Sequence, residues 1–288
     1  MLDPPRHPLV GIVVKARAWL PAFRAIAGMT WKEWAAYRTH MAVSLLTGPL
    51  RFLIMAWLWT ATLAEKGRVL DHGREEWVAY SGLAVLIGYV LFDFADWNLH
   101  MLVRTGRFAN YLLLPFPHLF LAFAQKLGHR SLALLIEAVP VWALISWWLG
   151  HPLLPNNPLP FMLSVIQGFV LTYLINYAVG LLGFWMTRTE GLRRCLVLLR
   201  ETLGGAYLPL AFFPLAWQPV LFLLPYAWAL YIPISIGLAP ATGSIAIAGQ
   251  EFTPWQALAG QSLVMAVWGV GLFGLQSLAM RRFLAAGG

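Results

Sequence analysis

The chain has 288 residues, of which 60% are hydrophobic and only 11% are charged, and its formal net charge is +8. Soluble domains contain about 25% charged residues, so this composition excludes an ordinary soluble protein and indicates an integral membrane protein. The single cysteine, Cys195, excludes an intramolecular disulfide and a thiolate metal cage. In a membrane protein, basic residues retained on cytoplasmic loops explain the positive charge without a nucleic-acid partner.

The first 40 residues are expected to lie outside the membrane core. Residues 15–40 are basic and rich in aromatics, and apolar side chains such as Phe23 and Trp34 recur at helical spacing. This pattern predicts an amphipathic helix at the cytoplasmic membrane interface. A helix packed on the protein's own core is the alternative. The remaining residues, 41–288, are expected to form one all-α transmembrane domain.

Six membrane-spanning helices are expected in this domain. Each contains an apolar run near the roughly 20 residues that a spanning helix needs. A basic and aromatic connection at 95–130 separates the second and third spans. The expected spans are 41–64, 77–94, 131–149, 161–186, the start of 192–238, and 255–280.

The tract 192–238 cannot be one helix. As a single helix it would be roughly 70 Å long, more than twice the hydrocarbon core, and glycines and prolines interrupt it repeatedly. It carries no charge after Glu201, so it is not a solvated loop. We therefore expect a fifth span followed by re-entrant helices at about 205–238, buried in protein or lining a cavity.

The distribution of basic residues orients the expected spans. Sixteen of the twenty Lys and Arg residues gather on one side if that side holds both termini, the 95–130 connection and the 187–200 turn. Basic loops are retained in the cytoplasm. The sequence therefore predicts a multi-pass protein of the bacterial cytoplasmic membrane with both termini in the cytoplasm.

Ionisable residues inside the expected spans are functional candidates by default. Arg51 is close enough to its helix end for the side chain to reach lipid headgroups. Arg200 could form an ion pair with Glu137 on another helix, and this pair could be structural or part of a proton relay. The four candidates are Arg51, Glu137, Arg200 and Glu201.

The acidic residues at the end of the second span suggest a different arrangement. Asp93 and Asp96 lie near Arg104 and Arg107 in the sequence, which favours an interfacial charge network. No chain of acidic residues is expected to cross the membrane. This argues against a proton-driven carrier.

Motifs for catalysis and nucleotide binding are missing from the sequence. The dipeptide Gly-Lys does not occur, so the chain contains no P-loop, and H-E-x-x-H and G-x-S-x-G are also absent. The seven histidines are scattered and predict no metal cluster. We expect no catalytic residue, no metal site and no cofactor bound by this chain, which disfavours a lipid-modifying membrane enzyme.

Two motifs, in this order along the chain, resemble those of the permease subunits of ABC-2 type exporters. The first is R-x-G-[RK]-x-x-x-x-L-L-x-P, which begins at Arg104 and ends at Pro115. The second is a proline-rich tract between Gly205 and Leu238, preceded by Gly183-Phe184-Trp185. The resemblance covers nearly the whole chain in order.

The resemblance implies a six-span subunit that dimerises with itself or with a sister permease. ATP and Mg²⁺ would bind two separate ATPase subunits. The few intramembrane charges and the many Trp, Phe and Leu residues fit a hydrophobic or amphipathic cargo such as a drug or lipid, and they fit ordinary lipid-facing packing equally well. An ATP-independent channel or secondary carrier is the main alternative. The residues implied for ATPase coupling are Arg104, Thr105, Gly106, Arg107, Leu114 and Pro115; those implied for the translocation path or outer gate are Gly205, Pro209, Pro214, Pro225, Tyr226 and Pro233.

Overall fold

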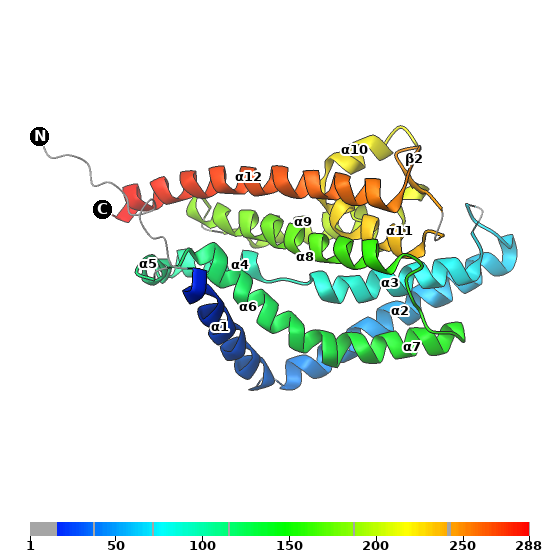
Figure 1. Cartoon of the computed structure of the whole chain (residues 1–288), viewed down its shortest axis with the longest axis horizontal. Coiled ribbons are helices and arrows are strands. Elements are labelled where there is room, and N and C mark those ends of the chain that lie inside the picture. Colours follow the sequence, from blue (N-terminus) through cyan, green and yellow to red (C-terminus); the bar gives the residue numbers. More distant parts are fainter. Residues whose placement is uncertain are drawn as a thin grey trace, which may run out of the picture.

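The computed structural model describes residues 16–36, 38–70, 72–114, 116–186, 188–240 and 243–287, with the backbone alone for some helix residues. The long helices lie roughly along the longest axis of the molecule, and α12 lies beside α8 (Figure 1). The protein is an all-α membrane protein apart from one short hairpin.

Helices account for nearly all of the regular structure, and several are interrupted. The N-terminal half contains α1 (Ala16–Ala36), α2 (Arg38–Lys66), α3 (Arg74–Leu91), α4 (Ala95–Arg104), α5 (Phe108–Leu112), α6 (His118–Ala133), the π-helix η2 (Leu134–Ala138) and α7 (Val139–Leu149). The C-terminal half contains α8 (Pro158–Leu181), η3 (Leu182–Phe184), α9 (Glu190–Leu203), η4 (Leu210–Phe212), α10 (Gln218–Leu223), the π-helix η5 (Ala227–Tyr231), α11 (Ile232–Leu238), β1 (Ile245–Ile247), β2 (Gln250–Phe252) and α12 (Pro254–Gly287).

Four helical stretches in the described part of the chain are long and apolar enough to cross a membrane. They include the expected spans 2, 3, 4 and 6. The expected spans 1 and 5 correspond to α2 and α9, which are not among the four, so a total of six spans stays a prediction. The four stretches are Arg74–Arg104, His118–Leu149, Pro158–Phe184 and Pro254–Phe283.

The 95–130 connection is much shorter than the sequence indicates. Helix α4 extends the second span to Arg104, and α6 begins the third span at His118. Only residues 105–117, which include α5, separate the two helical stretches. The prediction of a long polar connection was wrong, because charged residues at both of its ends, such as Asp96 and Lys126, lie inside helices, are buried and form ion pairs.

Two π-helices precede prolines within helical stretches. Each ends two residues before a proline, at Ala138 before Pro140 and at Tyr231 before Pro233. Proline cannot donate the backbone hydrogen bond that an α-helix requires at its position. The wider π-turn accommodates this defect and lets the helix continue.

The expected fifth span is shorter than a bilayer. Helix α9 has 14 residues, or about 21 Å, against a hydrocarbon core of about 30 Å. After it the chain forms short turns of helix, and then a 12-residue apolar stretch, Ala227–Leu238. α10 and α11 lie at the end of the molecule opposite the C-terminal end of α12 (Figure 1).

Helix α1 packs against α6. Gly128 allows the close approach, because a Cβ atom at this position would lie 2.6 Å from the carbonyl oxygen of Ala27. The rings of Phe23 and Phe120 meet at 5.7 Å beside this contact. The helix expected at the membrane interface therefore also packs on the protein's own helices.

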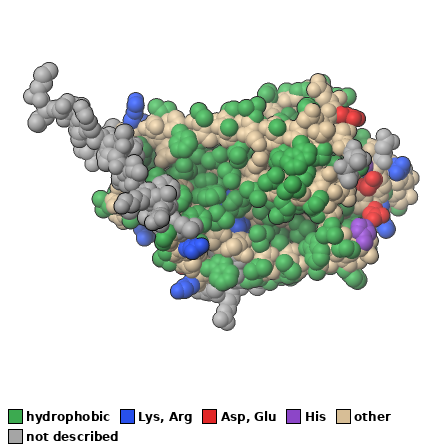
Figure 2. Space-filling view, viewed as in Figure 1, with side chains coloured by type: hydrophobic (Ala, Val, Ile, Leu, Met, Phe, Trp, Pro, Cys, Tyr) green, Lys and Arg blue, Asp and Glu red, His purple; other side chains and the backbone are tan. Residues whose placement is uncertain are grey.

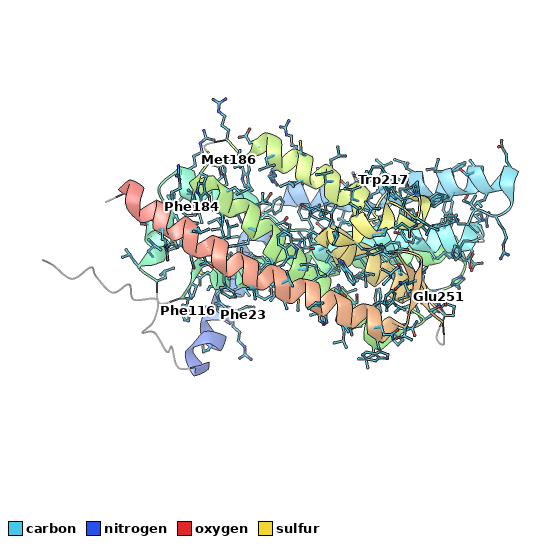
Figure 3. All side chains as sticks on the ribbon, turned by 90° about the horizontal axis from the view of Figure 1, so that it is seen from above. Phe23, Phe116, Phe184, Met186, Trp217 and Glu251 are labelled. Carbon is cyan, nitrogen blue, oxygen red and sulfur yellow. The ribbon has the colours of Figure 1, made fainter. Side chains whose placement is uncertain are left out.

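The surface separates an apolar middle from charged ends. Figure 2 shows hydrophobic side chains over the middle, Lys and Arg at the end that carries α5, and the acidic side chains, a histidine and further basic side chains at the other end. Figure 3 labels Phe184 and Met186 near the first end and Trp217 and Glu251 near the second. This distribution is that of a multi-pass membrane protein.

Candidate functional site: a helix break, its charges and the connection beyond it

The second helical stretch breaks between Leu91 and Ala95, where α3 ends and α4 begins. A break leaves backbone groups without helical partners, which is costly at membrane depth. Asp93 accepts a hydrogen bond from the amide of Ala95 at 2.8 Å. Arg130 donates one to the carbonyl of Tyr89 at 2.9 Å. Two charged side chains therefore cap the two helix ends, each with the sign that the helix dipole favours.

These two residues belong to a group of four buried charges, which we name the balanced cluster: Asp93, Lys126, Arg130 and Glu137. Lys126 lies 3.2 Å from Asp93, and their side chains are 2% and 3% exposed. It also donates a hydrogen bond to the carbonyl of Phe169 at 2.9 Å. Arg130 lies 3.9 Å from Glu137, and both are 3% exposed. Two positive groups from α6 thus meet one negative group from η2 and one from the break after α3, beside the backbone of α8.

A second group, which we name the α9 cluster, contains Arg51, Arg200 and Glu201. One oxygen of Glu201 lies 2.9 Å from Arg51 and the other 3.0 Å from Arg200. The side chains are 25%, 19% and 17% exposed for Arg51, Arg200 and Glu201, respectively. Arg200 and Glu201 line a cavity together with Thr172, near the middle of the stretch Pro158–Phe184. The cluster therefore lies at membrane depth and holds two cations for one anion.

The sequence paired these residues differently. Glu137 contacts Arg130 and Arg200 contacts Glu201, so both residues of the expected Glu137–Arg200 pair have other partners. The sequence predicted that the Arg51 side chain extends to the lipid headgroups. In the structure it forms an ion pair with Glu201. Arg51 and Glu201 lie far apart in the sequence, so spacing along the chain did not reveal their contact, whereas Arg200 and Glu201 are adjacent residues.

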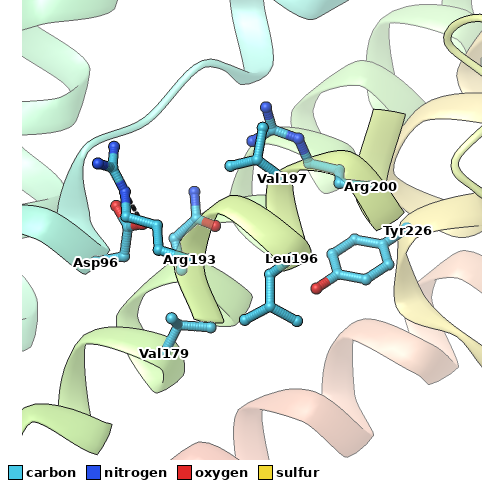
Figure 4. Close-up of a pocket in the computed structure, with 8 residues that line it drawn as sticks. Asp96, Val179, Arg193, Leu196, Val197, Arg200 and Tyr226 are labelled. Atoms are coloured by element: carbon cyan, nitrogen blue, oxygen red, sulfur yellow. Dashed lines mark hydrogen bonds and ion pairs between the residues drawn. The ribbon is translucent and has the colours of Figure 1, made fainter. Parts of the chain in front are cut away.

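Asp96 was also expected at the interface, near Arg104. It is buried and forms an ion pair with Arg193 of α9, with 2.6 Å between Oδ2 and Nε (Figure 4). The guanidinium of Arg193 also lies 5.3 Å from the centre of the Trp97 ring. This pair ties the first half of α9 to α4.

The connection after α4 exposes the basic and apolar residues expected to contact an ATPase. Arg104, Thr105 and Arg107 are exposed, and Leu114 is 46% exposed. Gly106 has a φ angle of +71°, which favours glycine and turns the chain between α4 and α5. Pro115, the last residue of the motif, lies outside the described residues.

One residue anchors the connection to the helices behind it. The ring of Phe108 is 3% exposed and lies 5.2 Å from that of Phe184 in η3 and 5.7 Å from that of Phe283 in α12. It also lies 5.5 Å from the ring of His118 in α6. His118 is within 3.1 Å of the hydroxyl of Tyr177 in α8. A displacement of α5 would therefore act on three long helical stretches.

The residues expected to form an outer gate lie in a well-packed region. Gly205 has a φ angle of +85° and its carbonyl accepts a hydrogen bond from Tyr80 at 2.7 Å. Tyr226 is half-buried. The four prolines divide by burial: Pro209, Pro225 and Pro233 are buried, whereas Pro214 is exposed.

Neutral side chains hold the end of this tract. Asn157 donates hydrogen bonds to the carbonyls of Ile236, Ala239 and Pro240, the shortest at 2.8 Å to Ala239. Gln261 of α12 donates to the carbonyl of Trp228 at 2.9 Å. Opening of the tract would break these hydrogen bonds.

Two cavities lined by described residues are small. They measure about 10 and 20 Å³ and have Arg200 in common. Each has room for about one water molecule. In the same residues, no group of three or more His, Cys, Asp or Glu side chains is placed to hold a metal ion.

Comparison with known proteins identifies the family of this chain. A family model described as "ABC-2 family transporter protein" matches residues 50–278, most of the chain. The chain belongs to the ABC-2 transporter family. No curated protein and no solved structure gives a match.

The matched part of this ABC-2 transporter contains both charge clusters, the connection after α4 and the tract between α9 and α12. The sequence revealed the last two through their motifs, but it missed the balanced cluster. One pattern could have indicated it: Lys126 and Arg130 are four residues apart and therefore lie on one face of a helix. Asp93 and Asp96 were available to pair with such a face.

Proposed function

We propose that this ABC-2 transporter is the membrane subunit of an ATP-driven exporter. It moves a hydrophobic or amphipathic molecule outward, and separate ATPase subunits that bind ATP and Mg²⁺ supply the energy. The observation that carries this proposal is the family match over residues 50–278. The lack of a P-loop in the sequence supports a motor on another chain.

In this proposal the chain crosses the bacterial cytoplasmic membrane six times with both termini in the cytoplasm. α2 and the segments α9 to α11 complete the two crossings beyond the four long stretches. Support comes from the basic residues at the end that carries α5 (Figure 2), since basic loops are retained in the cytoplasm. Lys126 and Arg130 lie inside the third stretch, so they no longer contribute to this argument.

The ATPase would dock on the connection after α4. Arg104 and Arg107 offer positive charge, and Leu113, which is 86% exposed, offers an apolar tip. When ATP binding closes the ATPase pair, the push on α5 passes through Phe108 to α6, η3 and α12. The permease pair, two copies or a copy with a sister subunit, then moves as rigid bodies between inward and outward arrangements. Residues 205–238 would lie near the outer mouth of the path.

Substitutions in the connection test this coupling. Arg104→Glu and Gly106→Pro should leave the helices of the subunit folded but uncouple ATP hydrolysis from transport, measured in proteoliposomes that contain the permease and its ATPase. Proline cannot adopt the φ angle of +71° found at Gly106, so the second variant changes the turn between α4 and α5. Arg68→Glu, a charge reversal at an exposed residue in the α2–α3 loop, is the matched control and should transport normally. Wild-type coupling in both connection variants would contradict the proposal.

An ion-driven secondary carrier is the second candidate, and the balanced cluster is the observation that favours it. Buried charges of both signs can pass protons through a membrane protein. In this cluster, however, Asp93 and Arg130 hold backbone groups at the helix break. Transport that follows a proton gradient without ATP would establish the carrier and reject the exporter.

A further inference from the structure

The α9 cluster leaves one positive charge without a counter-ion among the described residues. Arg51 and Arg200 share the carboxylate of Glu201. The other intramembrane charges of the described chain are matched: the balanced cluster is neutral, and Asp96 pairs with Arg193. An unmatched guanidinium at membrane depth is costly, so its presence calls for an anion.

The space beside this charge is a cleft along the inner side of α9. We name the two cavities that have Arg200 in common the α9 cleft. Leu196 and Val197 of α9 and the ring of Tyr226 line the first cavity (Figure 4), and Leu91 and Phe92 help to line the second. A charged centre with apolar walls on both sides matches the chemistry of an amphipathic molecule.

One wall of the cleft is weakly attached. None of the residues of α9 is buried. Among the described residues, two ion pairs join this helix to other helices: Arg193 with Asp96, and Glu201 with Arg51. Leu203, at the C-terminal end of α9, packs against the core, but the rest of the helix can move outward without uncovering it. This movement would widen cavities that now have room for about one water each.

We propose that the α9 cleft binds the anionic head group of an amphipathic molecule. Arg200 and Arg51 hold its phosphate or carboxylate, and the apolar walls hold its chain. Guanidinium groups suit this task because they bind such anions through paired, charge-assisted hydrogen bonds. Asp96 also faces the cleft, but Arg193 neutralises it. Binding of this molecule does not depend on the proposed exporter function; only its role as the transported cargo rests on that function.

Binding is tested on the purified full-length chain in dodecyl maltoside, without the ATPase. Radiolabelled dodecyl phosphate is the probe. Dodecylphosphocholine, which adds a positive group to the same phosphate and chain, and inorganic phosphate, which lacks the chain, are the competitors. Dodecyl phosphate should bind saturably, and the zwitterion should compete at least roughly tenfold more weakly, because the spare charge repels its ammonium group. Inorganic phosphate should compete still more weakly.

Variants locate the site. Arg200→Gln and Arg51→Gln should each raise the Kd for dodecyl phosphate roughly tenfold, the effect of losing one charge-assisted contact. Arg194→Gln removes the same charge from an exposed position of the same helix and should change nothing. Glu201→Gln should lower the Kd, since it releases both guanidiniums. Size-exclusion chromatography checks that each variant remains folded.

Three results would overturn the proposal. In the first, the zwitterion or inorganic phosphate competes as well as unlabelled dodecyl phosphate does. In the second, the Arg200→Gln and Arg194→Gln variants bind dodecyl phosphate with the same affinity. In the third, Arg200→Gln dissociates an oligomer of the chain and leaves the affinity unchanged. The last result would show that a second copy supplies the counter-ion. If binding behaves as proposed but dodecyl phosphate does not stimulate ATP hydrolysis by the complex with the ATPase, the binding site is supported and the exporter function is contradicted.

Discussion

The balanced cluster and the α9 cluster lie at similar depth but differ in charge and in exposure. Two anions match two cations in the first, and its side chains are at most 3% exposed. In the second, two cations share one anion at 17–25% exposure. The balanced cluster also bonds to the backbone of α3, α4 and α8. A charge at membrane depth can therefore be structural when partners surround it, whereas the spare charge beside the α9 cleft is the basis of the proposed binding site.

Removal of one partner from the balanced cluster should have the largest effect. Lys126→Met leaves Asp93 buried without its ammonium partner, so we expect a loss of about 3–5 kcal/mol in the free energy of unfolding. The measurement is thermal unfolding of the purified chain in detergent.

The double variant Asp93→Asn/Lys126→Met is the control. It removes both charges, and the asparagine oxygen can still accept the hydrogen bond from Ala95. It should be more stable than Lys126→Met alone. A double variant at least as unstable as the single one would show that the pairing of charges does not govern stability here.

A neutral cap offers a sharper test of what charge contributes. Asn157 caps the end of α11 much as Arg130 caps the end of α3, but without a charge. Asn157→Ala should therefore lower the free energy of unfolding by about 1–2 kcal/mol, because backbone carbonyls lose their hydrogen-bond donor. This loss should be smaller than that of Lys126→Met in the same unfolding assay. A larger loss would mean that burial, and not charge, sets the cost.

The α9 cluster should tolerate substitution. In Arg200→Gln the remaining Arg51 still has Glu201 as a partner, and the groups are partly exposed, so stability should change by less than about 1 kcal/mol. The same thermal unfolding assay checks this expectation. A loss comparable to that of Lys126→Met would make the two clusters alike and remove the basis for a binding role.

The smallest effect concerns an ion pair outside the membrane. His151 lies 2.6 Å from Glu75, and this hydrogen bond raises the pKa of His151 above its usual value of 6.5. The pair therefore contributes stability below about pH 6.5, and the contribution is lost as the pH rises through the raised pKa. Unfolding midpoints measured between pH 5 and 9 should show a small decline that Glu75→Gln abolishes. An identical decline in that variant would assign the effect to another group.

Hydrophobic patterning predicted most of the fold. The apolar runs of α7, α8 and α12 indicated helices close to those observed, and the prolines and glycines indicated that residues 205–238 form short segments. The β1–β2 hairpin was not predicted, because its strands have three residues each. The Ala248-Gly249 turn between them, with φ angles of +52° and +79°, is the local feature that could have indicated it.

The charged residues were the harder part of the site. Asp93 was assigned to the end of the second span and Lys126 to the polar connection, because charges usually mark the ends of spanning helices. That rule fails where opposite charges pair across helices. Arg51 and Glu201 are separated by about half of the chain, so only the folded structure could bring them together. The exposed connection from Arg104 to Leu114 was recognised because its residues are consecutive.

Dodecyl phosphate titration of two variants tests the contrast between the clusters most directly. Asp93→Asn/Lys126→Met alters only the balanced cluster, and Arg200→Gln alters only the α9 cluster. We expect the folded double variant to bind dodecyl phosphate with the Kd of the unmodified chain. Arg200→Gln should raise this Kd roughly tenfold. An equal loss in both variants, or a loss confined to the double variant, would contradict the division into a structural cluster and a binding cluster.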